Sequence, residues 1–382
     1  MTIARMRERV TETVNEVSGG RRGRHTGRDI ASYELLSRYR EVLMGVSILL
    51  IMTFHYTEDL ADLQGERFDG PARIFYSYIG SSGVDVILVL SGLGLYYSWK
   101  RLPDAAVFYR RRLARVLVPY LMVALPGWAW LDLVRDDAGV PRLLGDITFV
   151  TFFTDDVKWF WYVLISLVCY AMFPHVFSAL DGACDHVSAW LRTLLMCGLC
   201  MQLVMMLDQY DPGLYDNVDI AVNRVPSFIV GCLVGKLSYE RRRLSMKGVL
   251  AGLAIVVLLL YPLRMATTPV VQVLLRALLD FLGCICGIVL LSRLEASPSN
   301  GLRGIHDAVC RILGWFGRYS LELYLLHVLV RKVLNVTGHS AAFPQYEMVV
   351  VLAALMLSVP LNRLSKIIQR PLMEGRRPQA AS

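Results

Sequence analysis

The sequence has few charged residues. Asp, Glu, Lys and Arg together make up 19% of its 382 residues, whereas 55% are hydrophobic. A soluble domain of this size could not hide so much apolar surface in a single core. The longest predicted loop has about 25 residues, which is too few to bury a core of its own. We therefore expect neither an ordinary soluble protein nor a separate extramembrane domain, and any chemistry must take place on apolar helices and short loops.

The eight cysteines form no disulfide framework. Cys197 and Cys200 have the spacing of a redox pair, but they lie in a predicted membrane helix, where we interpret them as small packing residues. No spacing typical of metal ligands occurs, so we expect no metal. No secretory signal peptide is predicted, because residues 1–40 are polar and rich in arginine.

The chain does contain ten apolar segments, and its mean hydropathy is +0.46. Most are long enough to cross a bilayer, which takes roughly 17–25 residues. Backbone polar groups in lipid must be satisfied internally, which requires helices. The sequence therefore predicts an all-α integral membrane protein, a bundle of about ten transmembrane helices. The predicted spans are 41–57, 77–98, 116–133, 159–178, 189–208, 219–237, 248–263, 270–291, 313–333 and 346–364.

The basic residues predict an orientation. With a cytoplasmic N-terminus, 27 of the 40 Lys and Arg residues fall in inner segments and 8 in outer segments. This bias favours both termini in the cytoplasm. We expect a basic, disordered cytoplasmic arm over 1–38, a ten-helix membrane domain over 39–365 and a basic cytoplasmic tail over 366–382. The net charge of +8 then reflects topology, so the expected partner is the lipid bilayer rather than nucleic acid.

His55 lies near the outer end of the first predicted span. An ionisable side chain is costly in a bilayer and is by default a candidate functional residue. Its position alone equally allows a histidine at a helix end that contacts interfacial water. The other polar residues of the spans decide between these interpretations.

Four arginines, Arg110, Arg111, Arg112 and Arg115, stand just before the third span. Anchoring on the cytoplasmic side explains part of this cluster. Guanidinium groups also form bidentate contacts with phosphates, and a helix start would add backbone N–H donors. Arg111, Arg112 and Arg115 are therefore candidates for binding an anionic cytoplasmic cofactor such as acyl-coenzyme A.

Three polar or aromatic residues on the outer side are candidates for binding a substrate. Asp85 lies inside the second span. Trp159 opens the fourth span within an aromatic stretch, which fits either a membrane-interface belt or stacking on a sugar ring. Arg224 lies about one turn inside the sixth span, where it could reach interfacial water or face a polar cavity.

The ninth span carries several polar groups. Ser320, Tyr324 and His327 fall at i, i+4 and i+7, on one helical face, and Glu322 lies near the middle of the membrane. A lone buried histidine is usually a satisfied core residue. The combination with a tyrosine and a carboxylate favours function, so we take Glu322, Tyr324 and His327, with His55, as candidate catalytic residues.

Several of these segments, in this order, resemble the acyltransferase 3 family of integral-membrane acyltransferases, which modify cell-surface glycans. The resemblance covers roughly 40–365 and implies a ten-helix bundle. It departs from the family at Met44, eleven residues before His55, where members usually have arginine; Arg40 is about 22 Å from His55 along the helix axis. The matching stretches are the span ending in His55, Gly83–Gly92, the pattern Phe108-x-x-Arg111-Arg112-x-x-Arg115-x-x-x-Pro119, Trp159-Phe160, Arg224–Gly231 and Gly317–His327.

The resemblance implies transfer of an acyl group, most commonly acetyl, from acyl-coenzyme A to a hydroxyl of a surface or lipid-linked glycan. His55 would be a general base or a transient acyl carrier, and Arg224 or Tyr324 could stabilise an oxyanion. A transporter or flippase of a glycan or lipid precursor is the alternative, although no inverted repeat is evident. A sensory or anchoring protein is a third interpretation, and a homo-oligomer is compatible with the sequence.

Overall fold

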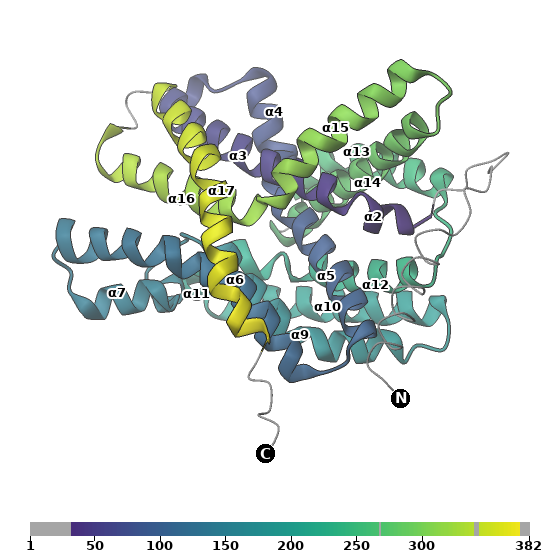
Figure 1. The fold of residues 1–382 in the computed structure, drawn as a ribbon, viewed down its shortest axis with the longest axis horizontal. Helices are drawn as coiled ribbons and strands as arrows, with labels where there is room; N and C mark the ends of the chain where they lie inside the picture. Colours follow the sequence, from purple (N-terminus) through teal and green to yellow (C-terminus); the bar gives the residue numbers. More distant parts are fainter. Residues whose placement is uncertain (1–31, 267–268, 340–343, 375–382) are drawn as a thin grey trace, which may run out of the picture. The chain divides into compact units, whose positions relative to one another are not determined.

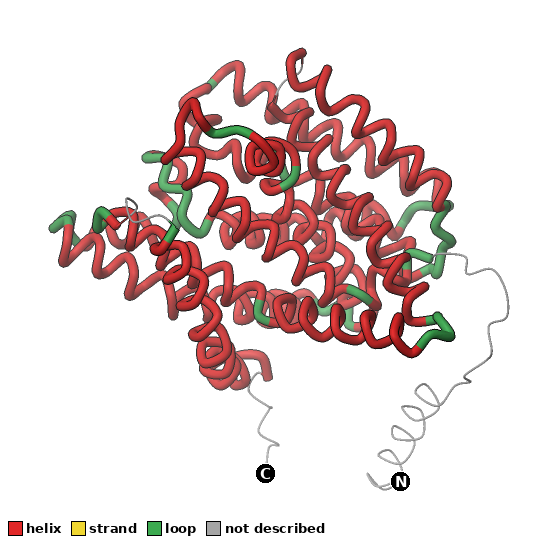
Figure 2. The backbone as a smooth tube through the Cα atoms, turned by 90° about the horizontal axis from the view of Figure 1, so that it is seen from above, coloured by secondary structure: helices red, strands yellow, loops and turns green. Residues whose placement is uncertain are grey.

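In a computed structural model, residues 32–266, 269–339 and 344–374 are described, and they form helices joined by short turns (Figures 1 and 2). Within these residues the extended structure is limited to an isolated bridge between Ser32 and Arg243. The helices are α2 (Glu34–Arg38), α3 (Arg40–Gln64), η1 (Gly65–Arg67), α4 (Gly70–Tyr78), η2 (Gly80–Ser82), α5 (Gly83–Arg101), α6 (Ala105–Ala129), η3 (Trp130–Arg135), α7 (Val140–Ile147), α8 (Val150–Thr154), α9 (Trp161–Asp181), α10 (His186–Tyr210), α11 (Pro212–Val222), α12 (Val225–Tyr239), α13 (Met246–Ala266), α14 (Pro269–Glu295), α15 (Asn300–Arg318), α16 (Ser320–Val336) and α17 (Gln345–Glu374).

Seven helical stretches of the described residues are long and apolar enough to cross a membrane, which confirms the predicted all-α membrane class. α3 is not among them because polar residues follow its apolar stretch and charges flank it, and α13 contributes only the shorter apolar helix Met246–Leu259. The count of ten spans stays a prediction. The seven are Gly70–Arg101, Ala105–Arg135, Trp161–Asp181, His186–Tyr210, Pro212–Tyr239, Val271–Glu295 and Gln345–Met373.

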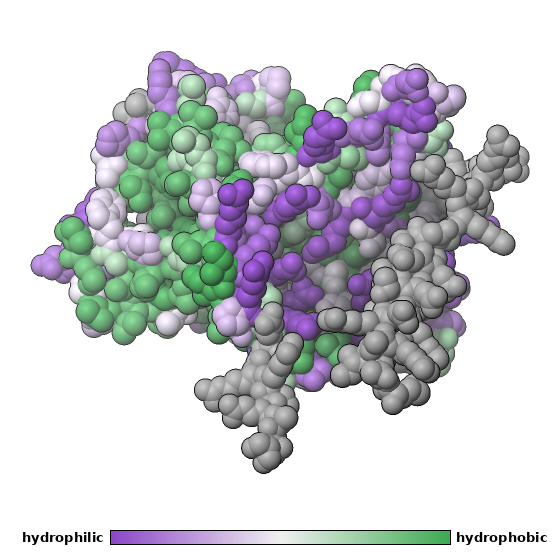
Figure 3. Space-filling view, viewed as in Figure 1, coloured by the Kyte–Doolittle hydropathy of each residue, from purple (hydrophilic) through white to green (hydrophobic). Residues whose placement is uncertain are grey.

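Large apolar side chains are exposed along these helices, as Figure 3 shows for one face. α10 exposes Leu194, Leu195 and Leu199, and α17 exposes Leu352 and Met356. Water would disfavour so much apolar surface, whereas lipid tails accept it. The exposed surface therefore agrees with the membrane assignment.

The chain ends differ from the predicted domain boundaries. Most of the predicted arm, 1–31, lies outside the described residues, as does the end of the predicted tail, 375–382. α2 occupies Glu34–Arg38 inside the predicted arm, and α17 continues to Glu374 inside the predicted tail.

Two glycine contacts set the centre of the fold. A Cβ on Gly92 of α5 would lie 2.6 Å from the Phe228 carbonyl oxygen, and a Cβ on Gly231 of α12 would lie 2.3 Å from the Val89 carbonyl oxygen. α5 and α12 therefore pack backbone against backbone, which only glycine permits at these positions. This close approach brings the start of α12 next to the start of α5.

The predicted ninth span is divided. α15 ends at Arg318 and α16 begins at Ser320, with Tyr319 between them at φ −107° and ψ 15° (Figure 1). α15 crosses α3 at a second glycine contact, because a Cβ on Gly317 would lie 1.8 Å from the Glu41 carbonyl oxygen. The chain changes direction after this crossing. α16 then packs against α3 and brings His327 to His55.

Candidate active site

Two histidines from distant parts of the sequence meet at the C-terminal half of α3. Nδ1 of His55 lies 2.5 Å from Nε2 of His327 in α16. Their rings are stacked, with centroids 4.7 Å apart and planes 28° apart. His327 is buried at 2% exposure, whereas His55 is half-buried. Because one proton lies between the two nitrogens, one ring donates and the other accepts. The contact uses Nδ1 of His55 and leaves its Nε2 for a reactant.

A buried ion pair joins the same two helices one turn further on. Arg331 follows His327 by four residues and donates from Nε to Oδ2 of Asp59 at 2.7 Å; Asp59 follows His55 by four residues. Arg331 Nη2 also donates to Glu58 at 2.8 Å. Burial raises the pKa of the Asp59 carboxyl, but its hydrogen bonds from Arg331 outweigh this and hold the pKa below the usual value.

Sequence reasoning missed Asp59 and Arg331 as parts of this site. Their signal is the shared i+4 spacing, which puts each on the face of its helix that carries a candidate histidine. Tyr346 of α17 also donates to Asp59, so a third helix holds this end of the site.

Tyr324 packs beside the histidine pair. Its ring centroid is 6.3 Å from that of His327, and the backbone N–H of Tyr162 in α9 donates to its hydroxyl oxygen at 3.4 Å. Tyr324 is 4% exposed. It therefore links α16 to the start of α9 and presents a phenol next to the imidazoles.

Asp85 and Arg224 form a second polar group. Arg224 Nε lies 3.4 Å from Asp85 Oδ2, and Ser227 Oγ donates to Asp85 Oδ1 at 2.7 Å. The Arg224 guanidinium also lies over the Trp161 ring, 5.2 Å from its centroid. Both charged residues are buried, so of the two alternatives for Arg224 the structure does not favour contact with interfacial water. The charge of Arg224 is instead paired with that of Asp85 in α5.

Trp159 is half-buried and stacks on Trp128 of α6, with centroids 4.3 Å apart and planes 24° apart. Phe160, next in the chain, has a left-handed conformation with φ 53°, which turns the chain into α9. The next two residues connect the two polar groups, because Trp161 contacts Arg224 and Tyr162 contacts Tyr324. The start of α9 therefore contacts one member of each polar group, Arg224 and Tyr324, and Trp159 lies two residues before it.

Glu322 does not join this group. Its Oε1 accepts a hydrogen bond of 2.7 Å from Asn362 of α17, whereas His327 pairs with His55. Glu322 lies within electrostatic reach of Arg115 and Lys366. The structure thus places it toward Arg115, and its hydrogen bond goes to Asn362 rather than to a histidine.

Arg111, Arg112 and Arg115 lie inside α6 rather than before it. α6 begins at Ala105, and Asp104 caps its start by accepting from the N–H of Val107. The expectation that a helix start beside the arginines offers free N–H donors is therefore wrong, because those donors lie earlier and one of them is already capped.

Arg111, Arg112 and Arg115 have few acidic residues around them to balance their charge. Arg111 and Arg115 are exposed and Arg112 is half-buried, and within the described part of the chain no carboxylate forms an ion pair with any of the three. Arg40 of α3 lies close enough for electrostatic repulsion with Arg112 and Arg115. The cluster therefore carries positive charge that an anion would neutralise.

The structure defines a multi-pass membrane protein with two contacting histidines, one buried and one half-buried, and a separate cluster of arginines that no carboxylate of the described residues neutralises. The chain matches the acyltransferase 3 family model, described as an acyltransferase domain, over residues 39–363. The chain belongs to this family, and the resemblance seen in the sequence is confirmed. It is accordingly a membrane acyltransferase. No curated protein and no solved structure matches it.

Proposed function

We propose that this protein is a membrane O-acyltransferase that moves an acyl group, in the simplest case acetyl, from cytoplasmic acyl-coenzyme A to a hydroxyl of a cell-surface or lipid-linked glycan. The observation that carries the proposal is the contact between His55 and His327. Two imidazoles in hydrogen-bond contact inside an apolar bundle are costly unless they handle protons.

The proposal includes ten spans in the cell membrane with both termini in the cytoplasm. Support comes from the seven apolar helices, from the shorter apolar helix Met246–Leu259 and from the excess of Lys and Arg in the predicted inner segments. With this orientation Arg111, Arg112 and Arg115 face the cytoplasm, and the histidine pair lies toward the outside.

The donor would bind at the arginine cluster. Acyl-coenzyme A carries several phosphate charges, and Arg111, Arg112 and Arg115 offer guanidinium groups that no carboxylate of the described residues neutralises. Arg40, one helix away, adds a further charge to the same region. This match of charge supports a coenzyme A thioester as the donor.

His55 would act as the general base. Its Nε2 takes the proton of an acceptor hydroxyl while the hydroxyl oxygen attacks the thioester carbonyl carbon, and the coenzyme A sulfur leaves and is protonated. His327 holds the ring of His55 through Nδ1 and shares the positive charge that forms. Tyr324 is placed better than Arg224 to stabilise the oxyanion, because Tyr324 packs on His327 whereas Arg224 already pairs with Asp85.

The acceptor would lie near the start of α9. Trp128 covers one face of the Trp159 ring, and the other face could stack on a sugar. Asp85 and Arg224 would hold the neighbouring backbone in place, because Arg224 also donates to the carbonyl oxygens of Ser81 and Ile220.

The test replaces His55 by alanine and measures transfer from radiolabelled acetyl-coenzyme A, together with the mass of surface glycans. The rate should fall at least about 100-fold, as for loss of a general base. His175→Ala is the matched control, because His175 is exposed on α9 and should keep full activity. Normal acylation by the His55→Ala protein contradicts the catalytic role. Movement of a glycolipid without release of coenzyme A supports a transporter instead.

A further inference from the structure

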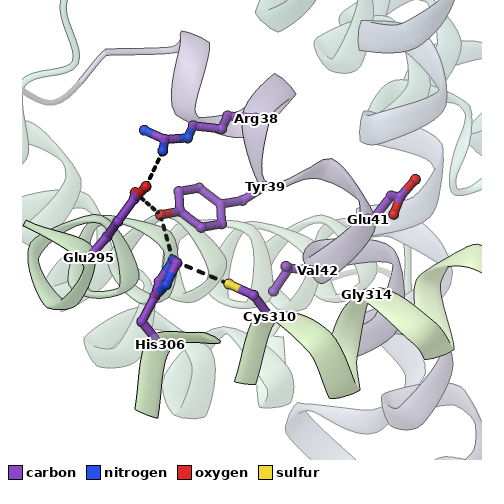
Figure 4. Close-up of a pocket in the computed structure, with 8 residues that line it drawn as sticks. All are labelled: Arg38, Tyr39, Glu41, Val42, Glu295, His306, Cys310 and Gly314. Carbon is purple, nitrogen blue, oxygen red and sulfur yellow. Dashed lines mark hydrogen bonds and ion pairs between the residues drawn. The ribbon is translucent and has the colours of Figure 1, made fainter. Parts of the chain in front are cut away.

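A second group of reactive side chains lies where α15 passes the start of α3. His306 and Cys310 are four residues apart and therefore share one face of α15. Cys310 Sγ is 3.4 Å from His306 Nε2, and His306 Nδ1 is 2.9 Å from Asp307 Oδ1. Figure 4 shows the thiol pointing at the imidazole. The thiol of Cys310, the imidazole of His306 and the carboxylate of Asp307 are thus joined by successive hydrogen bonds.

The hydrogen bonds around His306 allow a neutral ring that accepts a proton from Cys310. The Tyr39 hydroxyl, 3.2 Å from His306 Nε2, donates to Glu295 Oε2 at 3.0 Å (Figure 4). Asp307 accepts the proton on Nδ1, which directs the lone pair of Nε2 at the thiol. The S–H of Cys310 is then the donor that Nε2 can accept. The imidazole is therefore oriented as a base toward sulfur.

The group opens into a cavity of about 220 Å³, lined among others by Arg38, Tyr39, Glu295 and Cys310. His306 is buried and Cys310 is half-buried, so a reagent in the cavity can reach the sulfur. Burial and the carboxylates of Glu295 and Asp307 raise the pKa of the thiol. The resting group is therefore a thiol that needs His306 to take its proton, rather than a free thiolate.

The cavity and the arginine cluster are linked through the residues at the start of α3. Tyr39 and Arg38 line the cavity, while Arg40, the next residue, is within electrostatic reach of Arg112 and Arg115. A coenzyme A thioester bound at the arginine cluster would therefore lie at the same end of α3 as the thiol.

We propose that Cys310 is an acyl-accepting thiol that takes the acyl group of an acyl-coenzyme A, with His306 as its general base and Asp307 as a positioning residue. The donor identity rests on the proposed function. Sγ attacks the thioester carbonyl carbon as its proton passes to His306 Nε2. The bond from that carbon to the coenzyme A sulfur breaks, and the leaving thiolate takes the proton from His306. One thioester replaces another, so no oxidant or further reactant is required.

This acylation is separate from the chemistry at His55. Tyr39 in the cavity wall and His55 are 16 residues apart, which is about 24 Å along a helix axis. An acyl group on Cys310 is therefore remote from the histidine pair, and its formation should not depend on His55.

The experiment incubates the full-length purified protein with acetyl-coenzyme A and follows thioester formation by mass spectrometry of tryptic peptides. The peptide 304–311 contains Cys310 as its one thiol. The acetyl mass should appear on this peptide and be removed by neutral hydroxylamine. Cys184, an exposed free thiol, is the internal control for spontaneous acylation. We expect Cys310 to react at least about 10-fold faster, although it is less exposed.

Two variants separate the site from a merely structural role. His306→Asn should slow labelling of Cys310 at least about 100-fold, as expected for loss of a base, and leave labelling of Cys184 unchanged. Asp307→Asn is an exposed substitution that should fold normally and lower the rate of labelling by a smaller factor. Absent labelling, equal labelling of Cys310 and Cys184, or labelling that is insensitive to both substitutions overturns the proposal.

The His55→Ala protein distinguishes this inference from the proposed function. Labelling of Cys310 should persist in it while glycan acylation is lost. Glycan acylation by the wild-type protein without any label on Cys310 contradicts the thiol site and supports the proposed function. Label on Cys310 without acylation of any glycan contradicts the proposed function and supports the thiol site. If neither label nor glycan acylation is found, both proposals are contradicted.

Discussion

Arg331 and Asp59 illustrate how residues next to the histidine pair can set its geometry. They are 7% and 9% exposed, and they connect α16 to α3 one turn beyond the histidine pair. Breaking a buried ion pair by removing one partner is costly, because the other charge stays buried and unpaired. The contact between His55 and His327 therefore depends on charges outside the pair.

We predict that Arg331→Met lowers the free energy of unfolding by about 3–5 kcal/mol, because it leaves Asp59 buried without its cation. Thermal unfolding in detergent at pH 7 measures the change. The double variant Arg331→Met/Asp59→Asn should recover part of the loss, since position 59 then no longer carries a buried, unpaired charge. A single variant as stable as the wild type would show that the pair contributes nothing.

The pKa of the Asp59 carboxyl determines the pH at which thermal unfolding should be compared. Its pKa is lowered in the folded protein, so the folded state favours the ionised form. The contribution to stability is fully present above the unfolded value of about 3.9 and is lost as the pH falls through the lowered folded pKa. A comparison at pH 7 therefore reports the full contribution of the pair.

At the scale of elements, the crossing of α3 and α15 decides where the candidate groups lie. Gly45 and Gly317 are in direct contact with carbonyl groups of the opposite helix, since a Cβ on Gly45 would lie 1.9 Å from the Leu313 oxygen. The crossing places the start of α3 against Cys310 and His306 of α15, and it ends where the chain turns into α16. Both the histidine pair and the thiol site depend on it.

Gly317→Ala should destabilise the protein by about 1–3 kcal/mol or more, because its Cβ would overlap the Glu41 carbonyl and backbone cannot move aside cheaply. The melting temperature in detergent is the measurement. Gly198→Ala on α10 is the matched control, because its Cβ meets open space and alanine is the better helix former. Equal melting temperatures for the two variants would show that the crossing tolerates side chains.

Elements also show where sequence reasoning failed. The apolar run 313–333 was predicted as one span, yet the structure divides it at Tyr319, because hydropathy does not register a backbone turn between two apolar helices. Arg111, Arg112 and Arg115 were predicted before a helix start, although α6 begins at Ala105 with Asp104 as its cap. Asp104 is a residue type that commonly caps helices, and as a cap it predicts the start of α6 correctly.

For the whole molecule, the charge bias predicts which loops face the cytoplasm, and Cys184 offers a direct test. It lies in the predicted inner segment 179–188 and is an exposed free cysteine. A membrane-impermeant maleimide should label it in inverted vesicles and not in intact cells. Asp137→Cys in a Cys184→Ser background, in the predicted outer segment 134–158, should show the opposite pattern. Labelling of Cys184 in intact cells would reverse the proposed topology.

The sequence by itself determined the class of protein and its individual candidate residues. Apolar composition, the excess of inner arginines and the ordered motifs are properties of local segments, and lipid imposes helices on such segments whatever their packing. The family assignment needed no tertiary information, because the motifs follow one another along the chain.

Only the tertiary structure decided which of these residues act together. His55 and His327 are 272 positions apart, and nothing local in either segment indicates that one imidazole faces the other. The same holds for Asp85 with Arg224, and for Glu322, which pairs with Asn362 instead of the candidate histidines. Helix periodicity predicts which face a residue occupies. The neighbour of that face depends on glycine contacts and buried ion pairs between helices, which the packed bundle alone establishes.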